Sequence, residues 1–354
     1  MNTYCQPFFA NGLSVTSSQW IGIIPNKGLC MFLAITLLII GLVLLVYGAD
    51  RLVYGAAVLS RSFGIPPLII GMTIVGIGTS LPELIVSVTA ALNNQTDMAV
   101  GNVLGSNITN LLLIVGGAAL IRPLTVRSEI LRRELPLMLL VTVLCGFLLA
   151  NNHLSRGDGI ILLLAAAAFI VLMLKIARLA HAEGNDILTR EQLAELPQDS
   201  STTVALLWLV LAFIILPLSA KMIIDNATVI ARVAGVSELV IGLTVIAIGT
   251  SLPELATFIA GALKGEDDMA VGNIIGSNIF NIVIVLGVPA LLSPGDINPE
   301  AFQRDYWVML GVSVIFTILC LGRKHRIGHM AGALLLCGFI AYLAVLFFAP
   351  FRVV

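Results

Sequence analysis

The segment GMTIVGIGTSLPELIVSVTAALNNQTDMAVGNVLGSNITNLLLIVG, residues 71–116, occurs a second time in the same chain. Residues 242–287 read GLTVIAIGTSLPELATFIAGALKGEDDMAVGNIIGSNIFNIVIVLG, and the two copies align without a gap with about half of their positions identical. The offset of 171 residues also pairs Arg133-Glu134 with Arg304-Asp305, outside both copies. Shared hydrophobicity alone would not produce this similarity, so the chain is predicted to contain two copies of one structural unit.

The composition of the chain is that of a membrane protein. Mean hydropathy is +1.04, 58% of the residues are hydrophobic and only 11% are charged, against roughly a quarter in soluble proteins. The formal net charge of −1 provides no basic field for nucleic acid. The five cysteines are scattered without a CxxC pair, which favours small apolar residues over disulfides or metal ligands.

Outward from the repeats, the sequence reads as about ten hydrophobic spans of roughly 17 to 25 residues, a length that crosses a bilayer. We expect them at residues 31–50, 65–92, 98–121, 135–150, 158–178, 204–224, 236–263, 269–292, 306–322 and 330–349. The polar stretch 181–203 separates a first half, 31–180, from a second half, 204–354. Residues 1–30 are expected to form a poorly ordered extension without a signal peptide, with Met31 as an alternative start.

The orientation of the spans follows from the positive residues. Most of the 19 lysines and arginines lie on the inner side if the N-terminus is outside. This places the loop 181–203 in the cytoplasm and both termini outside. Because each half has an odd number of spans, the second copy must enter the bilayer with the opposite orientation. Such inverted repeats bring equivalent residues together near the middle of the membrane.

Each copy contains IGTSLPEL, at residues 77–84 and 248–255. Pro82 and Pro253 lack an N–H and clash with the carbonyl four residues back, so they loosen the helix. Glu83 and Glu254 follow these prolines. Two facing carboxylates in hydrocarbon would be costly and would repel each other. A divalent cation removes both costs, and calcium takes oxygen ligands from carboxylates, carbonyls and hydroxyls.

The second shared motif is GNxxGSNxxN, residues 101–110 and 272–281. Its glycines have the spacing that allows helices to approach closely, a feature that often reflects packing alone. Ser106 and Asn110 lie on one helical face, as do Ser277 and Asn281. These side chains supply neutral oxygens suited to sodium or to a carboxylate partner. None of the four histidines falls in a repeat, which disfavours a transition-metal site.

GTSLPEL and GNxxGSNxxN resemble the two α-repeats of the calcium:cation antiporter superfamily, and the resemblance covers nearly the whole chain from residue 31. The overall pattern, including LTREQLAELP in the loop, is most similar to bacterial inner-membrane sodium/calcium exchangers. The resemblance implies an all-α polytopic membrane protein with two inverted five-helix repeats. It also implies Ca2+ and Na+ as transported ions, no cofactor, and no obligate protein partner.

The resemblance further implies roles for individual residues. Glu83 and Glu254 would bind calcium and also sodium. The remaining oxygens would come from the carbonyls of Thr79 and Thr250, from carbonyls near Gly76 and Ala247, and from Ser80, Ser251, Ser106 and Ser277, with Asn110 and Asn281 opposite the glutamates. Some relatives carry Asp where this chain has Asn281, and in potassium-dependent exchangers that Asp is linked to potassium. Asn281 therefore favours potassium independence.

The mechanism implied is alternating access, in which sodium and calcium compete for the two glutamates. The first and sixth spans would slide across a core formed by the repeats. A Ca2+/H+ antiporter on the same site is the nearest alternative and would require the glutamates to exchange protons. A calcium-permeable channel uses similar ligands, but inverted repeats with broken helices favour a carrier. An intramembrane enzyme is disfavoured, because no nucleophile–base pair or cofactor motif accompanies the carboxylates.

Overall fold

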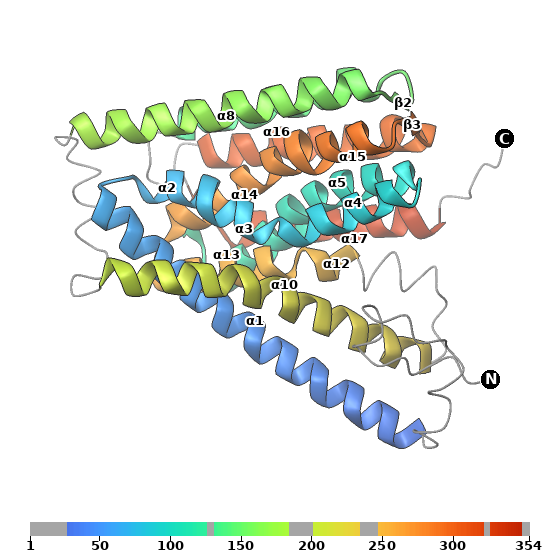
Figure 1. Ribbon diagram of the computed structural model, residues 1–354, viewed down its shortest axis with the longest axis horizontal. Coiled ribbons are helices and arrows are strands. Elements are labelled where there is room, and N and C mark those ends of the chain that lie inside the picture. The colour runs from blue at the N-terminus through green and yellow to red at the C-terminus, as the bar shows by residue number, and fades with distance from the viewer. Residues whose placement is uncertain (1–26, 126–130, 184–200, 234–246, 322–325, 349–354) are drawn as a thin grey trace.

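The computed structural model describes residues 27–125, 131–183, 201–233, 247–321 and 326–348 (Figure 1). The first half contains α1 (Lys27–Phe63), α2 (Pro67–Ile70), the π-helical segment η2 (Gly71–Val75), α3 (Gly76–Thr79), α4 (Leu81–Leu92), α5 (Thr96–Thr109), η3 (Asn110–Ile114), α6 (Val115–Ile121), strand β1 (Leu124–Thr125), α7 (Leu131–Leu149), strand β2 (His153–Leu154) and α8 (Arg156–Glu183).

The second half follows the same order. It contains α10 (Thr202–Val233), α12 (Ala247–Thr250), α13 (Leu252–Lys264), α14 (Asp267–Phe280), η5 (Asn281–Leu286), α15 (Gly287–Leu292), strand β3 (Gly295–Asp296), η6 (Ala301–Tyr306), α16 (Trp307–Leu321), strand β4 (Arg326–Ile327) and α17 (His329–Phe348). Most of the predicted extension 1–30 and linker 181–203 lies outside the described residues, at 1–26 and 184–200.

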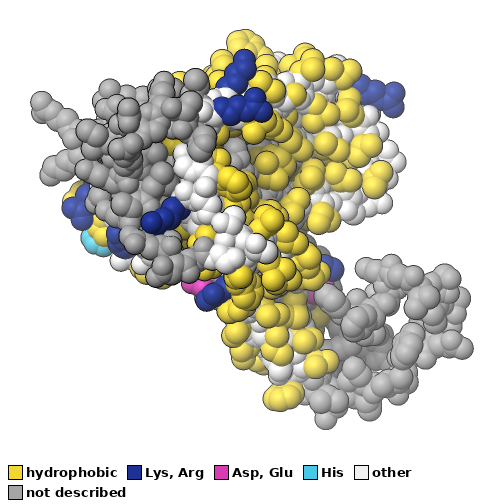
Figure 2. All heavy atoms as spheres, turned by 60° about the vertical axis from the view of Figure 1, so that its left-hand side comes forward, with side chains coloured by type: hydrophobic (Ala, Val, Ile, Leu, Met, Phe, Trp, Pro, Cys, Tyr) yellow, Lys and Arg dark blue, Asp and Glu magenta, His cyan; other side chains and the backbone are white. Residues whose placement is uncertain are grey.

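The all-α polytopic fold expected from the sequence is confirmed. In the described part of the chain, seven helical stretches are long and apolar enough to cross a membrane. The pair Pro67–Thr79 and Leu81–Leu92, bent by 44°, adds an eighth, and Glu134–Leu149 is a shorter apolar helix. The first part of the predicted span 236–263 lies outside the described residues, which resume at residue 247. The rest of the span forms α12 and α13. On the face drawn in Figure 2, hydrophobic side chains form large parts of the surface of the described residues.

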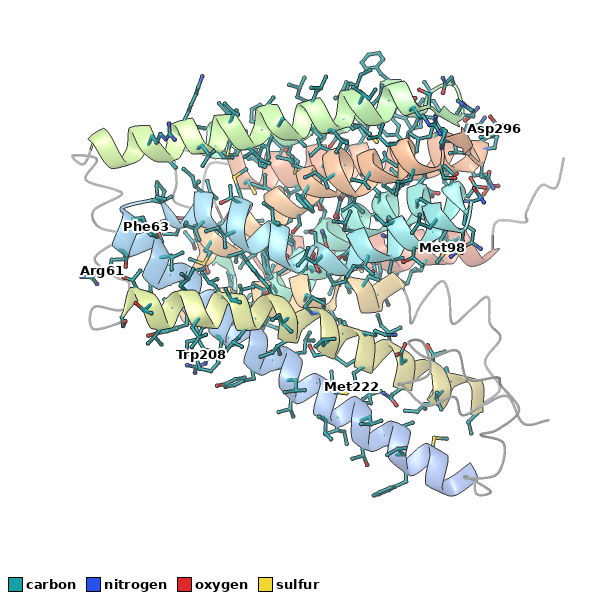
Figure 3. The ribbon with its side chains drawn as sticks, viewed as in Figure 1. Arg61, Phe63, Met98, Trp208, Met222 and Asp296 are labelled. Atoms are coloured by element: carbon teal, nitrogen blue, oxygen red, sulfur yellow. The ribbon has the colours of Figure 1, made fainter. Side chains whose placement is uncertain are left out.

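The two halves run in opposite directions. α5 starts at the end of the molecule where Figure 3 labels Met98 and Asp296, here called the Asp296 end, and α6 leads to the opposite end, marked by Arg61 and Phe63. α14 and α15 run the other way, from the Arg61 end to β3. Two short antiparallel sheets confirm the inversion: β1 pairs with β4, and β3, which lies 171 residues after β1, pairs with β2.

The repeat helices form the core of the protein. The main cluster of buried apolar residues is built on α5, η3, α14 and η5, with side chains from α7, α8, α16 and α17 around them. α14 is buried along most of its length. Each repeat switches from α-helix to π-helix at an asparagine, Asn110 in η3 and Asn281 in η5. These π-helical segments were not predicted from the sequence. Such segments occur frequently at functional sites.

α1 and α10 pack against each other and form a separate pair, which diverges from the core toward one end of the molecule (Figure 1). α1 reaches Phe63, so the predicted end of this span at residue 50 is wrong. Asp50 lies within the helix and forms two ion pairs: Oδ1 accepts a bond from Lys264 Nζ at 2.7 Å, and Oδ2 lies 3.1 Å from Arg51 Nη2. Lys264 ends α13, so this ion pair joins α1 to the core.

Candidate functional site

In each repeat a helix breaks at a serine. α3 ends before Ser80 and α12 ends before Ser251, and the two serines have nearly the same backbone angles, φ −86° and ψ 9° against φ −87° and ψ 8°. The break places Pro82 and Pro253 in the first turn of α4 and α13. There a missing N–H is harmless. The chain therefore avoids the clash with the preceding turn by starting a new helix.

The two glutamates occupy the first turns of these new helices. Glu83 and Glu254 are 1% and 0% exposed. The partial positive charge of a helix N-terminus favours a carboxylate at this position. Ser80 Oγ donates to Glu254 Oε1 at 3.1 Å, and Ser251 Oγ donates to Glu83 Oε1 at 3.4 Å. Each carboxylate is thus held by the serine of the opposite repeat, and the two bonds are related by the 171-residue offset.

The asparagines of the second motif also form hydrogen bonds between the two repeats. Asn110 Nδ2 donates to Asn278 Oδ1 at 2.9 Å, and Asn281 Nδ2 donates to Asn107 Oδ1 at 3.1 Å. All four side chains are buried. η3, which Asn110 begins, packs against α13, and η5, which Asn281 begins, packs against α4. Each asparagine therefore belongs to the element that packs on the helix carrying the other repeat's glutamate.

On one side of this centre the predicted ligands contact one another directly. Thr79 Oγ1 donates to Asn273 Oδ1 at 3.1 Å and lies 3.4 Å from Ser277 Oγ. Ser277 Oγ donates to the Gly76 carbonyl at 3.3 Å. The equivalent of Asn273 in the first repeat bonds differently: Asn102 Nδ2 donates to the Glu83 carbonyl and to Ser87 Oγ.

The other predicted ligands take equivalent positions. Thr250, buried, ends α12, and Ala247 is the first residue of that helix. Ser106, also buried, lies one turn before Asn110 on α5.

Four buried oxygens of the centre have no hydrogen-bond partner among the described residues. They are Glu83 Oε2, Glu254 Oε2, Asn110 Oδ1 and Asn281 Oδ1. Each is an acceptor, and together they form two pairs related by the repeat. Buried acceptors without donors cost free energy, so their occurrence on two carboxylates and two amides is typical of a site for a cation with oxygen ligands.

The chain matches a known protein family. The sodium/calcium exchanger protein family matches residues 33–175 and 204–348, which are the two halves described above. The chain belongs to this family. A sodium/calcium exchanger family member is a transporter and not an enzyme.

Individual relatives in this sodium/calcium exchanger family align with nearly the whole length of the chain. Inner membrane protein YrbG of Escherichia coli is 61% identical over 90% of this chain and 98% of its own length. Sodium/calcium exchanger MaX1 of Methanosarcina acetivorans is 31% identical over 88% of this chain and 98% of its own. The structure of the sodium-calcium exchanger NCX_Mj soaked with 10 mM Na+ and zero Ca2+ has a TM-score of 0.76 and 30% identity, and it covers 91% of this chain and 100% of that one.

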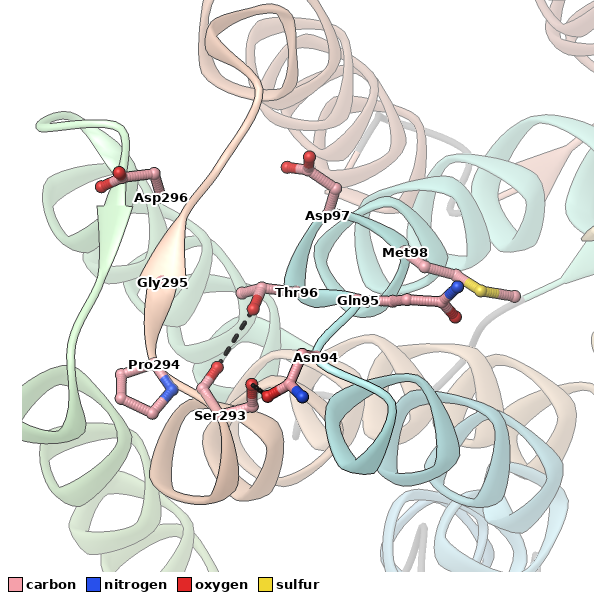
Figure 4. Close-up of a pocket in the computed structure, with 9 residues that line it drawn as sticks. All are labelled: Asn94, Gln95, Thr96, Asp97, Met98, Ser293, Pro294, Gly295 and Asp296. Atoms are coloured by element: carbon pink, nitrogen blue, oxygen red, sulfur yellow. Dashed lines mark hydrogen bonds between the residues drawn. The ribbon is translucent and has the colours of Figure 1, made fainter.

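A hollow of about 590 Å³ lies away from this centre in the exchanger, at the Asp296 end (Figure 4). It is lined by residues 94–98 and 293–296, and none of the predicted ligands lines it. Thr96 Oγ1 donates to the Ser293 carbonyl across it at 3.1 Å. At the Arg61 end the equivalent positions hold Asp267 and Arg122, which form an ion pair.

Sequence analysis missed four polar residues of the exchanger's centre as candidates: Asn102, Asn107, Asn273 and Asn278. Each belongs to GNxxGSNxxN, and each hydrogen-bonds within the centre. The signal was present, because Asn107 and Asn278 precede the candidate asparagines by three residues, one helical turn on the same face. Their partners, however, lie in the opposite repeat, and a linear pattern does not identify partners.

Proposed function

We propose that this exchanger moves calcium and sodium in opposite directions across the membrane, through one buried site between its inverted repeats. The observation that carries the proposal is the set of four buried oxygen acceptors without donors, on Glu83, Glu254, Asn110 and Asn281. Two carboxylates match the charge of one calcium ion. The structural relative NCX_Mj was soaked with Na+ and with Ca2+ or Sr2+, according to its descriptions, which supports the same ions here.

The buried carboxylates also supply a reason for strict exchange. An empty site carries two negative charges in a low-dielectric region, and Coulomb repulsion and desolvation oppose its movement. Calcium, or sodium ions in sufficient number, neutralise Glu83 and Glu254. Either load therefore permits the switch between the two access states, whereas the empty site does not. Since both ions need the same carboxylate oxygens, binding of one displaces the other.

The remaining oxygens divide between the two ions. The carbonyls of Thr79 and Thr250 would complete the calcium shell. The hydroxyls of Ser80, Ser251, Ser106 and Ser277 and the carbonyls near Gly76 and Ala247 would serve sodium. In this conformation the Gly76 carbonyl accepts from Ser277 Oγ and from the Ser80 N–H. Sodium at that position would replace the donation from Ser277, which is a long bond of 3.3 Å.

We assign the protein to a bacterial inner membrane with both termini on the periplasmic side. The surplus of lysine and arginine on the Arg61 end supports this orientation, as does the description of YrbG as an inner membrane protein. In this orientation the Arg61 end is cytoplasmic and the Asp296 end is periplasmic. The neutral side chain of Asn281 supports exchange that does not require potassium.

The test is calcium-45 uptake into proteoliposomes that contain the purified protein. Vesicles loaded with sodium are compared with sodium-free vesicles that carry a pH gradient, with and without external potassium. We expect uptake only with the outward sodium gradient, and the same rate without potassium. Glu254→Gln should abolish it, whereas the control Glu300→Gln, which removes an exposed carboxylate paired with Arg304, should retain it. Uptake driven by the pH gradient alone would refute sodium coupling.

A further inference from the structure

The two asparagines in each GSNxxN segment have different surroundings. Asn110 and Asn281, here called the central asparagines, each have an Oδ1 without a partner among the described residues. Asn107 and Asn278, here called the supporting asparagines, receive the Nδ2 bonds of the central pair, at 3.1 and 2.9 Å. Both bonds connect opposite repeats, and all four side chains are almost completely buried.

A primary amide has two ends of similar shape and opposite hydrogen-bonding character. Its oxygen accepts and can bind a cation, whereas its NH2 group donates and would repel one. A central asparagine is therefore useful to an ion only in one of its two orientations. When a fixed acceptor lies beside one end of the amide, the NH2 group turns toward it and the oxygen lies at the other end. A fixed acceptor therefore selects the orientation in which the oxygen is free to bind a cation.

Asn107 is itself held in one orientation by a group that cannot change its character. Its Nδ2 donates to the Asn278 backbone carbonyl at 3.2 Å and contacts Met309 Sδ at 3.5 Å. A backbone carbonyl can only accept, so the NH2 group of Asn107 must lie on that side. Its Oδ1 must then face Asn281, and Asn281 must present Nδ2 to it. The orientation passes from the backbone through Asn107 to Asn281. The Nδ2 of Asn278 has no partner among the described residues, so this backbone anchor belongs to Asn107, and Asn278 is assigned the same role from its bond to Asn110.

From this network we infer that Asn107 and Asn278 are positioning residues, which orient the central asparagine of the opposite repeat so that its oxygen is available to the transported ion. The inference rests on the proposed function of the site. It adds that ion affinity depends on two residues that do not touch the ion. It also explains why the hydrogen bonds cross between repeats, since each central amide is then oriented by the half of the protein it faces.

The alternative is that the supporting asparagines only hold the two repeats together, because buried amides join neighbouring membrane helices. The two roles predict different behaviour when the central residue becomes a carboxylate. Asp presents an oxygen in either orientation, so it needs no positioning. A loss that comes from misorientation should disappear in an Asn281→Asp background, whereas a loss that comes from weakened packing should remain.

The experiment is equilibrium binding of calcium-45 to the purified full-length protein in detergent, with thermal stability measured on the same samples. Four proteins form a cycle: the wild type, Asn107→Leu, Asn281→Asp, and the double variant. We expect Asn107→Leu to weaken calcium binding about tenfold with asparagine at 281, and by less than about twofold with aspartate at 281. The control Ser313→Ala, which removes a buried hydroxyl bonded within α16, should bind calcium as the wild type does.

The mirror-image cycle keeps the inference testable if Asn107→Leu fails to fold. It uses Asn278→Leu with Asn110→Asp and should show a loss in the same direction with the same suppression. Equal losses in both backgrounds of a cycle would overturn the positioning role while leaving the proposed function intact. Failure of the wild type to bind calcium would overturn the proposed function and the inference together.

Discussion

α5 and α14 carry the same motif, and the described residues include the packing partner of only one of them. On the α14 flank of the site, Gly272 and Gly276 lie against backbone, because a Cβ added there would overlap the carbonyl oxygens of Leu68 and Met72. On the α5 flank, a Cβ added at Gly101 or Gly105 would meet no atom of the described residues within 4 Å. The positions equivalent to Leu68 and Met72, 239 and 243, lie outside the described residues. The glycines of α14 therefore let it approach the backbone of the opposite repeat closely.

The centre between these flanks is symmetric. The bonds from Ser80 and Ser251 to the glutamates, and the bonds between asparagines, occur in both directions. A symmetric centre fits alternating access through inverted repeats, because both access states can then present the same ligands to the ion.

The largest effect is expected at the symmetric centre. Glu83→Gln and Glu254→Gln each remove one of the two charges that calcium requires, and each should lower calcium exchange about 100-fold or more. Because the two glutamates have equivalent positions, the two losses should be of the same size. Initial rates of calcium-45 uptake measure both. A variant that kept more than about a tenth of the wild-type rate would contradict the need for both charges, and clearly unequal losses would contradict the symmetry of the centre.

The next effect compares the glycines of the two flanks. Gly276→Ala should lower the free energy of unfolding by about 1–3 kcal/mol or more, because its methyl group has no space against the Met72 carbonyl. Gly105→Ala is the matched change on α5, and the repeat predicts a loss of the same order; a cost below about 0.5 kcal/mol would show that α5 has no such close neighbour. Thermal unfolding in detergent measures both.

The smallest effect compares the two ends of the molecule. Asp267 is buried, and its Oδ2 accepts from the Thr125 N–H at 2.9 Å, while Oδ1 lies 3.4 Å from Arg122 Nη1. Asp267→Ala leaves that N–H without an acceptor and should cost about 1–3 kcal/mol of unfolding free energy. The matched change Thr96→Ala, at the hollow of the Asp296 end, should cost less than about 1 kcal/mol. Equal costs, measured by thermal unfolding, would show that the ion-paired end is no more tightly held than the other.

Much of this architecture could be predicted from the sequence, because the inversion follows from the repeat and the odd number of spans. Glu83 and Glu254 stood out because a carboxylate next to proline inside an apolar span has few structural explanations. The helix break was placed less well. The prolines were expected to disturb the preceding turn, whereas the chain ends the helix at Ser80 and Ser251 and starts another.

Other features depend on contacts that a linear pattern does not contain. The ion pair of Asp50 in α1 is one of them, because its partner Lys264 is more than 200 residues away in the sequence. The supporting asparagines act through partners in the opposite repeat.

The central claim is that calcium and sodium compete for the carboxylates of Glu83 and Glu254. The most direct measurement is calcium-45 bound to the purified protein at equilibrium as sodium chloride is raised, with choline chloride as the control for ionic strength. We predict that sodium releases all of the bound calcium, that choline releases little, and that Glu254→Gln binds none. Calcium that stays bound at saturating sodium would contradict a shared site, and with it the proposed exchange mechanism.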